Sequence, residues 1–406
     1  MNTVLPLLGE TPASLELPAA ALENVARTPF GLYVHVPFCA TRCGYCDFNT
    51  YTSDELGPGA NRSEYAGTAI AELRRAAETL GPDLPTVSTV FVGGGTPTLL
   101  PADDLAAVLA QIQRLFPVAD DVEVTTEANP ETVSTAYLTR LREAGFTRVS
   151  LGMQSAAEHV LAVLDRRHTP GRAVQAAHEA AAAGFEHVNL DLIYGTPGET
   201  DEDWAASLDA VLGSPVDHVS AYALIVEEGT RLARRISRGE LPMTDDDVLA
   251  DRYVQADATL REAGFDWYEV SNWATDDAAR CRHNELYWAN ANWWGIGPGA
   301  HSHVGGLRWW NVKHPAVYAD RLARGESPAQ DSELLDDADR ALETIMLGLR
   351  LREGLPLSLL SGAGRERARV AVADGLLEPG AHAAGSAVLT DRGRLLADAV
   401  IRDLTD

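Results

Sequence analysis

The 406-residue chain has few cysteines, few basic residues and no long apolar run. Four cysteines do not make a disulfide framework in a chain of this length, so a reducing compartment is expected. No apolar run approaches the roughly 20 residues that span a membrane, which leaves a peripheral membrane association at most. The short apolar stretch 4–8 lacks preceding basic residues, which argues against a secretory signal. These absences predict a soluble, cytoplasmic protein.

Positive charge is scarce throughout the chain. The 33 Lys and Arg residues face 59 Asp and Glu residues, for a net charge of −26. This balance repels a polyanion unless a local basic patch offsets it, and no such patch is evident, so no nucleic-acid partner is expected. Hydrophobic residues make up 46% of the chain, enough to bury the core of one large α/β domain and a smaller one.

From residue 31 onward, apolar β-branched stretches alternate with Ala-rich stretches of helical period. The expected strands span 31–36, 87–92, 122–126, 148–151, 187–190 and 218–222. The expected helices span 64–79, 103–115, 135–144, 171–183, 201–212 and 247–263, followed by a short stretch at 267–270. Alternation at this spacing indicates a parallel sheet. The expected fold is therefore α/β, a partial barrel of the (β/α)6 type.

The chain is expected to divide into four segments: an N-terminal extension over 1–28, a core barrel over 29–272, a connecting region over 273–331 and a C-terminal domain over 332–406. The C-terminal domain should begin with an amphipathic helix over 332–352. Two strand-like stretches, 375–377 and 388–390, and a closing helix over 392–404 then resemble a small winged-helix-like α+β domain. Because the chain is acidic, a covering or partner-binding role is favoured for this domain over DNA binding.

Distinctive polar residues fall at one end of the expected strands. The cysteine loop follows the first strand, Gly93–Thr98 follow the second, Glu127 ends the third, Gln154 lies just past the fourth, Asp191 ends the fifth, and Tyr222 and Ala223 end the sixth. In β/α barrels the active site is built at the carboxyl ends of the strands, so these residues are expected to gather at one site.

The glycine run after the second strand, Gly93-Gly94-Gly95-Thr96, has two readings. It carries no Gly-Lys-Ser/Thr and lacks the spacing of a dinucleotide fingerprint, so it is neither a P-loop nor a Rossmann motif. A tight strand-to-helix turn would explain the glycines alone. Alternatively, the missing side chains let the backbone approach the polar groups of a ligand.

Three of the four cysteines, Cys39, Cys43 and Cys46, fall within eight residues. Three soft thiolates this close suit a [4Fe–4S] cluster whose fourth iron stays open to an outside ligand. Zinc is the alternative and needs a fourth ligand, from Cys281 or from a histidine such as His35. Structural zinc sites usually have a distant second ligand pair, which is absent here. Cys281 would otherwise close the cluster or be a buried bystander thiol.

The spacing Cys39-x3-Cys43-x2-Cys46 resembles the cluster motif of the radical S-adenosylmethionine (radical SAM) superfamily. The strings Tyr33-Val-His-Val-Pro-Phe-Cys39 and Tyr45-Cys46-Asp47-Phe48 resemble the branch that contains oxygen-independent coproporphyrinogen III oxidase. The resemblance extends from about residue 31 to the C-terminus. It includes Gly93–Thr98, Glu127, Gln154, Arg166 and the string Asp191-Leu-Ile-Tyr-Gly195-Thr-Pro-Gly198.

The resemblance implies a role for each of these residues. S-adenosylmethionine would chelate the open iron, and an electron donor to the cluster would drive its cleavage to a 5′-deoxyadenosyl radical. Its amino-acid end would be held by Gly94, Gly95 and Thr96, its charges by Glu127 and Arg166, its ribose hydroxyls by Gln154 and Asp191, and its adenine by Tyr33, Tyr45 and Ala223.

Two departures separate this chain from the decarboxylating oxidases of that branch. The oxidases carry a further cysteine two residues after the third cluster cysteine, where this chain has Phe48, and their N-terminal region is longer. The string Cys46-Asp47-Phe48-Asn49 resembles the heme-chaperone members instead. The segment His283-Asn284-Glu285-Leu286-Tyr287-Trp288 also matches the His-Asn-x-x-Tyr-Trp motif of that group.

His283 is therefore a candidate axial ligand for heme iron, since neutral imidazole is a common heme ligand. Five of the eight tryptophans lie between Trp288 and Trp310 and would supply an apolar surround. The alternative is that these aromatic residues only pack the seam between barrel and tail.

The resemblance implies a heme chaperone that binds heme, a [4Fe–4S] cluster and S-adenosylmethionine and passes heme to an apo-acceptor, such as a respiratory-chain protein. It implies no coproporphyrinogen oxidase activity. Two alternatives stay open: an oxygen-independent coproporphyrinogen III oxidase, and a radical SAM enzyme that acts on another substrate.

Overall fold

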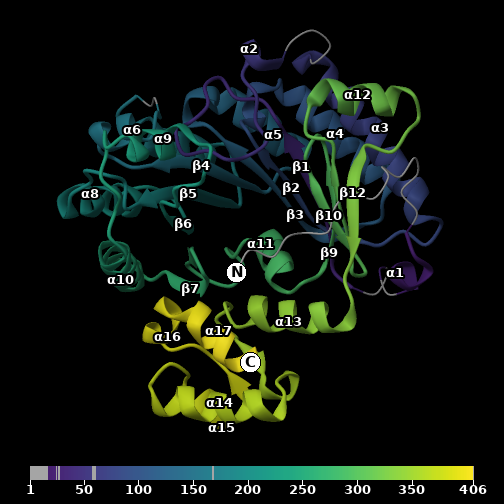
Figure 1. The fold of residues 1–406 in the computed structure, drawn as a ribbon. Coiled ribbons are helices and arrows are strands. Elements are labelled where there is room, and N and C mark those ends of the chain that lie inside the picture. The colour runs from purple at the N-terminus through teal and green to yellow at the C-terminus, as the bar shows by residue number, and fades with distance from the viewer. Residues whose placement is uncertain (1–16, 24, 26–27, 57–60, 167–168, 406) are drawn as a thin grey trace. The chain divides into compact units, whose positions relative to one another are not determined.

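A computed structural model describes residues 17–23, 25, 28–56, 61–166 and 169–405 (Figure 1). The expected N-terminal extension over 1–28 lies largely outside the described residues. Contacts divide the chain into two compact units, the first comprising 1–41, 48–124 and 291–336 and the second comprising 42–47, 125–290 and 337–406. These limits differ from the four expected segments, whose boundaries stay a prediction.

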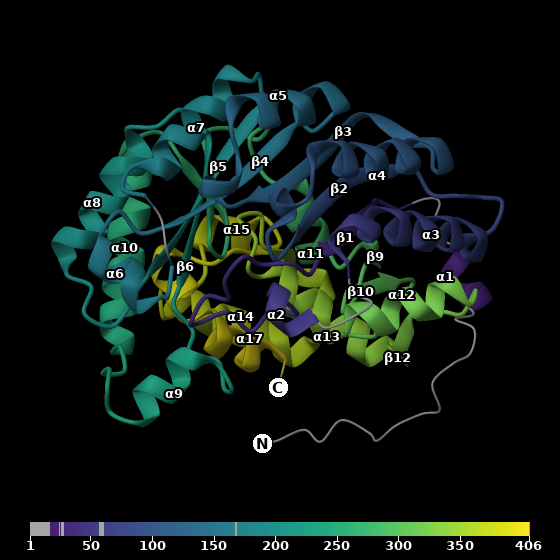
Figure 2. The same cartoon turned by 90° about the horizontal axis from the view of Figure 1, so that it is seen from above.

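The first unit is built on strands in the order β12-β11-β10-β9-β1-β2-β3. β2 and β9 pair with β1 in parallel, whereas β9 to β12 pair antiparallel. Figure 2 shows α3 and α4 side by side over these strands. The strands are β1 (Phe30–Val36), β2 (Val87–Gly94), β3 (Val118–Ala128), β9 (Asn292–Ile296), β10 (His301–Val304), β11 (Leu307–Asn311) and β12 (Ala329–Leu334), and the helices are α1 (Ala19–Glu23), α2 (Ser53–Leu56), α3 (Arg62–Leu80), α4 (Ala102–Leu115) and α12 (Pro315–Ala323).

The second unit takes up β3 from its midpoint and continues in the order β3-β4-β5-β6-β8-β7. β3 to β6 are parallel, and β8 and β7 add an antiparallel edge. The elements are β4 (Arg148–Gln154), β5 (His187–Tyr194), β6 (His218–Ala223), β7 (Asp266–Glu269), β8 (Asn272–Ala274), α5 (Thr135–Ala144), α6 (Glu158–Val163), α7 (Arg172–Ala182), α8 (Asp201–Leu212), α9 (Arg231–Ser237), α10 (Asp246–Glu262) and α11 (Arg282–Trp288).

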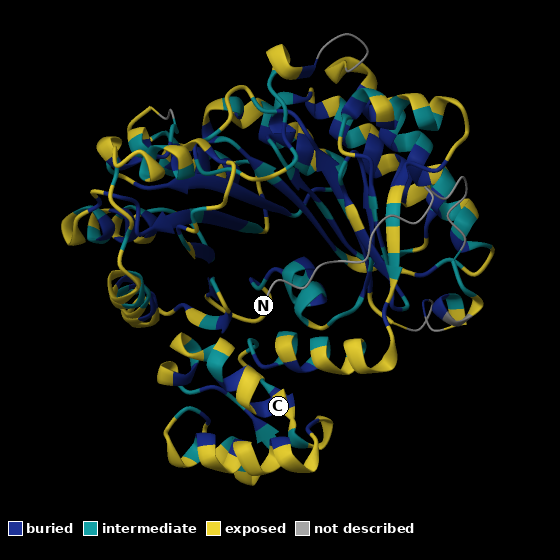
Figure 3. Cartoon of the chain, in the orientation of Figure 1, coloured by how far each residue is buried: buried dark blue, intermediate teal, exposed yellow. Residues whose placement is uncertain are grey.

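Burial explains why these strands read as apolar runs. Every residue of β4 is buried, and β4 to β6 are largely dark blue in Figure 3, as expected for parallel strands covered on both faces. Helix ends follow local capping chemistry. Thr200 and Asp203 form a reciprocal capping box at the start of α8, and Gly145 ends α5 with a φ of 109°, which favours glycine. The ranges expected for these two helices are confirmed.

The C-terminal part of the second unit has an apolar core of its own, which includes Leu349, Leu377 and Leu404. The helices α13, α14 and α17 contribute residues to this core, and Figure 1 shows α14, α15 and α17 grouped together. The elements are α13 (Asp337–Gly348), α14 (Gly362–Ala373), α15 (Pro379–Ala383), α16 (Asp391–Leu395), α17 (Ala397–Thr405) and the two-residue strands β13 (Leu355–Pro356) and β14 (Ser386–Ala387).

Three expectations for this part need correction. The amphipathic helix expected over 332–352 is the shorter α13, because 332–334 lie in β12 and the helix ends at Gly348. The expected wing strands 375–377 and 388–390 meet only in a single bridge between Leu377 and Leu389. The expected closing helix is two helices, α16 and α17, because Leu396 leaves the helical conformation between them.

The six expected barrel strands and the helices between them are confirmed. The fold is α/β, a partial (β/α)6-type barrel with a small C-terminal α+β domain. The stretch 273–331, expected only as a connection, carries β9 to β12. Among the described residues, no helix has the length and apolar character needed to cross a membrane.

Candidate functional site

In the first unit, the glycine run supports the start of the cysteine loop. The Gly95 amide donates to the Val36 carbonyl at 2.8 Å, and the Thr96 amide donates to the Phe38 carbonyl at 2.7 Å. A Cβ on Gly95 would lie 2.5 Å from the Phe38 carbonyl oxygen, closer than real Cβ contacts. The Thr96 hydroxyl lies 4.0 Å from the Cys39 sulfur. The missing side chain of Gly95 thus admits the backbone that leads into Cys39.

Gly95→Ala should therefore displace this backbone. We expect overpacking to lower the free energy of unfolding by about 1–3 kcal/mol and reconstituted iron content to fall. Gly67→Ala is the matched control, because its Cβ on the solvent side of α3 meets no atom within 4 Å. That variant should be more stable by about 0.5–1 kcal/mol. Equal iron content in the two variants would show that Gly95 does not support the loop.

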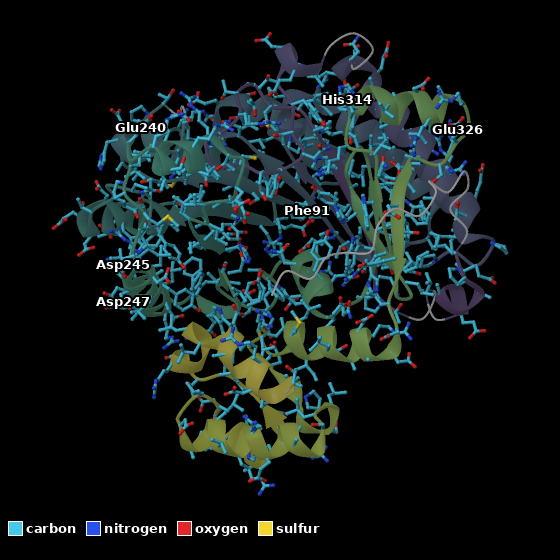
Figure 4. The ribbon with its side chains drawn as sticks, in the orientation of Figure 1. Phe91, Glu240, Asp245, Asp247, His314 and Glu326 are labelled. Atoms are coloured by element: carbon cyan, nitrogen blue, oxygen red, sulfur yellow. The ribbon has the colours of Figure 1, made fainter. Side chains whose placement is uncertain are left out.

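Gly94 and His35 form the other half of this turn. Gly94 has a φ of 107°, and a Cβ there would lie 2.5 Å from the His35 ring, so glycine is required twice over. His35 Nδ1 pairs with the Tyr33 hydroxyl and Nε2 with the Asn49 carbonyl, each at 2.9 Å. Both ring nitrogens are thus engaged, which weighs against His35 as a zinc ligand. The Tyr33 ring lies 6.3 Å from that of Phe91, labelled in Figure 4.

In the second unit, three contacts hold the middle of the cysteine loop. The Gly44 amide donates to the Leu164 carbonyl at 2.9 Å, and its carbonyl accepts from the Leu232 amide at 2.8 Å. Arg166 Nη1 donates to the Cys43 sulfur at 3.4 Å, and Nη2 donates to the Gly152 carbonyl at 3.1 Å. The Arg166 guanidinium thus places a positive charge beside the Cys43 sulfur.

Tyr45 lies between the two cysteines of this unit. Burial raises the pKa of its phenol, and the negative charges of Cys43 and Cys46 raise it further. Its ring packs against the apolar cluster that contains Leu164 and Leu232. Tyr45 is therefore a neutral, partly exposed aromatic ring beside the thiolates.

Gln154 and Arg166 lie close together at the carboxyl end of β4. Gln154, the last residue of β4, has a φ of 68°, in a region that non-glycine residues rarely occupy. A Cβ on Gly152 would lie 2.7 Å from both Arg166 Nη2 and Gln154 Nε2. Such backbone strain persists only where the surroundings fix it, and it is frequent at functional sites.

The sequence predicts that Asp191 ends the fifth strand, which is wrong. Asp191 is the fifth of the eight residues of β5. The strand continues because Leu192, Ile193 and Tyr194 are apolar and buried. The Asp191 carboxylate accepts from the Ser150 hydroxyl at 2.9 Å and from Asn189 Nδ2 at 2.8 Å. Burial raises the pKa of Asp191, and these donors oppose the shift.

Glu127 and Ala223 lie where the sequence places them. Glu127 is the penultimate residue of β3 and Ala223 is the last residue of β6, and both are partly exposed. The parallel order β3 to β6 brings Glu127, Gln154 and Ala223 to the same end of the second unit's strands.

The His-Asn-x-x-Tyr-Trp segment lies in α11, and its polar side chains form hydrogen bonds within the protein. His283 is 1% exposed, and its Nε2 lies 2.9 Å from the Tyr287 hydroxyl. Burial lowers the pKa of His283 to about 3. The Asn284 and Trp288 side chains hydrogen-bond to the Glu269 carboxylate, whose pKa burial raises to about 7. In this conformation the segment ties α11 to the β7–β8 edge.

Three buried residues that the sequence reasoning missed connect to this region: Asn189, His218 and Tyr268. Asn189 and His218 are buried polar residues in the largely buried strands β5 and β6, and polar positions inside such strands are the available signal. Cys281 is buried at the start of α11, where its amide donates to the Tyr268 hydroxyl at 3.1 Å.

Within the described residues, no group of three or more His, Cys, Asp or Glu side chains is arranged to hold a single metal ion. The assignment of a cluster to Cys39, Cys43 and Cys46 therefore rests on their donor chemistry. Three closely spaced thiolates, with Arg166 beside one of them, are suited to an iron–sulfur cluster.

Comparisons with known proteins agree with this arrangement. The chain matches the family model of the radical SAM superfamily over residues 33–211 and that of the HemN C-terminal domain over residues 335–396. The heme chaperone HemW of Mycobacterium tuberculosis (strain H37Rv) is 56% identical over 392 residues, which cover 97% of this chain and 98% of the relative. This chain belongs to the HemW family.

A second HemW family member, from Bacillus subtilis, is 33% identical over 91% of this chain and 97% of the relative. Among solved structures, coproporphyrinogen III oxidase (HemN) from Escherichia coli superposes with a TM-score of 0.80 over 95% of this chain and 92% of that chain. At 22% identity, this match shows that the HemW family member described here shares the HemN fold.

Proposed function

We propose that this protein is a cytoplasmic heme chaperone that binds heme, a [4Fe–4S] cluster and S-adenosylmethionine and transfers heme to an apo-acceptor, such as a respiratory-chain protein. The observation that carries the proposal is the 56% identity to a heme chaperone across nearly the whole of both chains. Phe48 supports it, because this side chain is 60% exposed where the decarboxylating oxidases carry a cysteine.

The thiolates of Cys39, Cys43 and Cys46 would hold the cluster. A separate electron donor would reduce it. When bound, the cluster and S-adenosylmethionine supply one-electron chemistry. Arg166 contributes a fixed positive charge to the site, and Tyr45 excludes water from the thiolates. The residues proposed to hold S-adenosylmethionine are Tyr33, Tyr45, Gly94, Gly95, Thr96, Glu127, Gln154, Arg166, Asp191 and Ala223.

Heme would be ligated by His283. Because this imidazole is buried and paired with Tyr287, ligation requires Nε2 to exchange the Tyr287 hydroxyl for iron and α11 to open toward the ligand. The low pKa of His283 favours this role, since only the neutral imidazole binds iron.

Titration with heme, followed by its Soret absorbance, tests the ligand. We expect His283→Ala to weaken heme binding at least tenfold, because a bond to iron is lost. Tyr287→Phe is the matched control on the same helix, since it removes only the competing hydroxyl and should bind heme at least as tightly as the unmodified protein. An unchanged heme spectrum in His283→Ala would contradict the assignment.

The pH dependence of the same titration follows from the pKa of about 3. An exposed histidine with a pKa of about 6.5 would lose about thirtyfold in iron affinity between pH 8 and pH 5, as protons compete for the imidazole. The His283 imidazole is still neutral at pH 5, so heme affinity should change less than twofold over this range in Glu269→Gln, a background without the other group near α11 that titrates there. A thirtyfold loss would show that iron binds a solvent-exposed histidine instead.

The likeness to the HemN fold supports a second candidate, oxygen-independent coproporphyrinogen III oxidase. Against this candidate, the sequence has Phe48 at the position where the resemblance requires a cysteine. The two functions differ in a single measurable product, protoporphyrinogen IX.

A further inference from the structure

A chain of buried hydrogen bonds begins at Asp191 in the second unit. Asn189 Nδ2 donates to Asp191 Oδ1 at 2.8 Å and also to the hydroxyls of Ser150 and Ser220. The side-chain oxygen of Asn189, Oδ1, lies 2.7 Å from His218 Nδ1. Asn189 is 3% exposed, so water does not compete for these bonds.

The chain continues from His218 to α11. His218 Nε2 lies 2.7 Å from the Tyr268 hydroxyl, which accepts from the Cys281 amide at 3.1 Å. Tyr268 is 0% exposed and Cys281, which precedes α11, is 4% exposed. Four hydrogen bonds thus connect the Asp191 carboxylate to Cys281, the N-cap residue of the His-Asn-x-x-Tyr-Trp helix.

The bonds have one direction. Oδ1 of the Asn189 side chain can only accept a hydrogen bond, so His218 Nδ1 carries a proton. The neutral ring then accepts at Nε2 from the Tyr268 hydroxyl. Burial, and then the charges of Arg148 and His187, lower the pKa of His218 well below its usual value and keep it neutral. Every donor therefore points toward Asp191, and a change at either end is felt along the same polarised path.

A second contact fixes the same end of α11. Arg148, on β4, donates through Nη2 to the carbonyls of Ala279 at 2.6 Å and Arg280 at 2.8 Å. Arg148 and His218 lie on strands of the same sheet as Asp191. The start of α11 is therefore attached to the strands that carry Asp191, and it is not a freely placed helix.

We propose that Asn189, His218 and Tyr268 are positioning residues that couple the S-adenosylmethionine pocket at Asp191 to the heme-binding helix α11. This inference rests on the proposed function. A ribose hydroxyl bound to Asp191 fixes the carboxylate. Through the hydrogen bonds of Asn189, His218 and Tyr268, it also fixes the Cys281 amide. Heme ligation still requires α11 to open, and it then opens about a Cys281 end that S-adenosylmethionine has already ordered, so the two ligands should bind with positive cooperativity.

Heme titrations with and without S-adenosylmethionine test this coupling on the protein with its cluster reconstituted. S-adenosylmethionine should tighten heme binding at least about fivefold in the unmodified protein. Tyr268→Phe keeps the ring that packs on His218 but removes the hydroxyl, and should reduce the effect to less than twofold. Tyr253→Phe is the matched control. It removes a hydroxyl that is bonded to Arg394 and is not part of this series of hydrogen bonds, so it should keep the full effect.

Hydrogen exchange at the Cys281 amide provides a readout that does not need heme. Bound S-adenosylmethionine should slow this exchange in the unmodified protein and in Tyr253→Phe, but not in Tyr268→Phe. If both ligands bind and neither the heme affinity nor the exchange rate responds to S-adenosylmethionine, the coupling is refuted while the proposed function stands. If heme does not bind, the proposed function fails, and the exchange measurement alone decides the coupling.

Discussion

Alanine at Cys39, Cys43 or Cys46 should abolish cluster loading. Iron and acid-labile sulfide should fall from about four of each per chain to near zero, because a cluster held by three thiolates does not survive the loss of one ligand. In the second unit, Cys43→Ala also leaves the Arg166 guanidinium without its sulfur partner. Iron analysis of the reconstituted variants measures the effect.

Cys281→Ala is the matched control for this experiment. Cys281 is buried at the start of α11 and would be the fourth ligand of a closed cluster. We expect this variant to keep its full iron content, since an open iron site needs only three thiolates. Loss of iron in Cys281→Ala, or tightly bound zinc in the unmodified protein, would contradict an open-site cluster.

Arg394→Ala should destabilise the second unit more than any surface substitution. Arg394 Nη2 pairs with Asp257 at 3.0 Å, and its guanidinium carbon lies 4.4 Å from the centre of the Trp267 ring. The two charged side chains are only 5% and 9% exposed. Without Arg394, the buried Asp257 carboxylate keeps Arg261 at 2.7 Å and the Trp273 indole at 2.9 Å but loses one charged partner, at a cost of about 1–3 kcal/mol. Urea unfolding followed by tryptophan fluorescence should show this loss.

Arg369→Ala provides the comparison for Arg394→Ala. Arg369, on α14, pairs with Glu366 at 2.5 Å, and both side chains are more than 60% exposed. Exposed pairs of this kind contribute little, so the change should stay within about 0.5 kcal/mol. If both variants unfolded at the same urea concentration, the Arg394 contact would not stabilise the attachment of α16 to α10 and β7.

The barrel elements could be predicted because period and capping agree with the fold at each position. β4 and α8 are examples: a strand in which every residue is buried, and a helix that begins after its capping Thr200 and ends before Gly213. Local sequence and tertiary burial favour the same structure there, and the expected ranges hold to within a few residues.

The strands β9 to β12 were missed because they are short and because aromatic residues there suggested seam packing. A signal was present: Gly305 and Gly306, both with positive φ, join β10 to β11 in a two-residue hairpin, and β11 alternates buried and half-buried side chains. In the C-terminal domain, strand-like composition around Leu377 and Leu389 yields one bridge, since packing on the helices limits the pairing.

For the site, spacing and residue type indicate which side chains matter but not what they touch. The sequence left two readings of the glycine run open, a tight turn and a close approach to a ligand, and it does not show that the Phe38 backbone lies where a Gly95 side chain would be. The burial of His283 and the bonds from Asn189 to Tyr268 depend on neighbours far away in the chain. Such contacts follow from the strand order, which a single sequence does not contain.

The most direct test of the central claim, that the protein carries heme and does not make the precursor protoporphyrinogen IX, uses the reconstituted protein in two parallel incubations. One contains coproporphyrinogen III, S-adenosylmethionine and reductant, and the other contains heme. We predict a saturable Soret band at one heme per chain and no protoporphyrinogen IX. Formation of protoporphyrinogen IX, or no heme binding, would contradict the account.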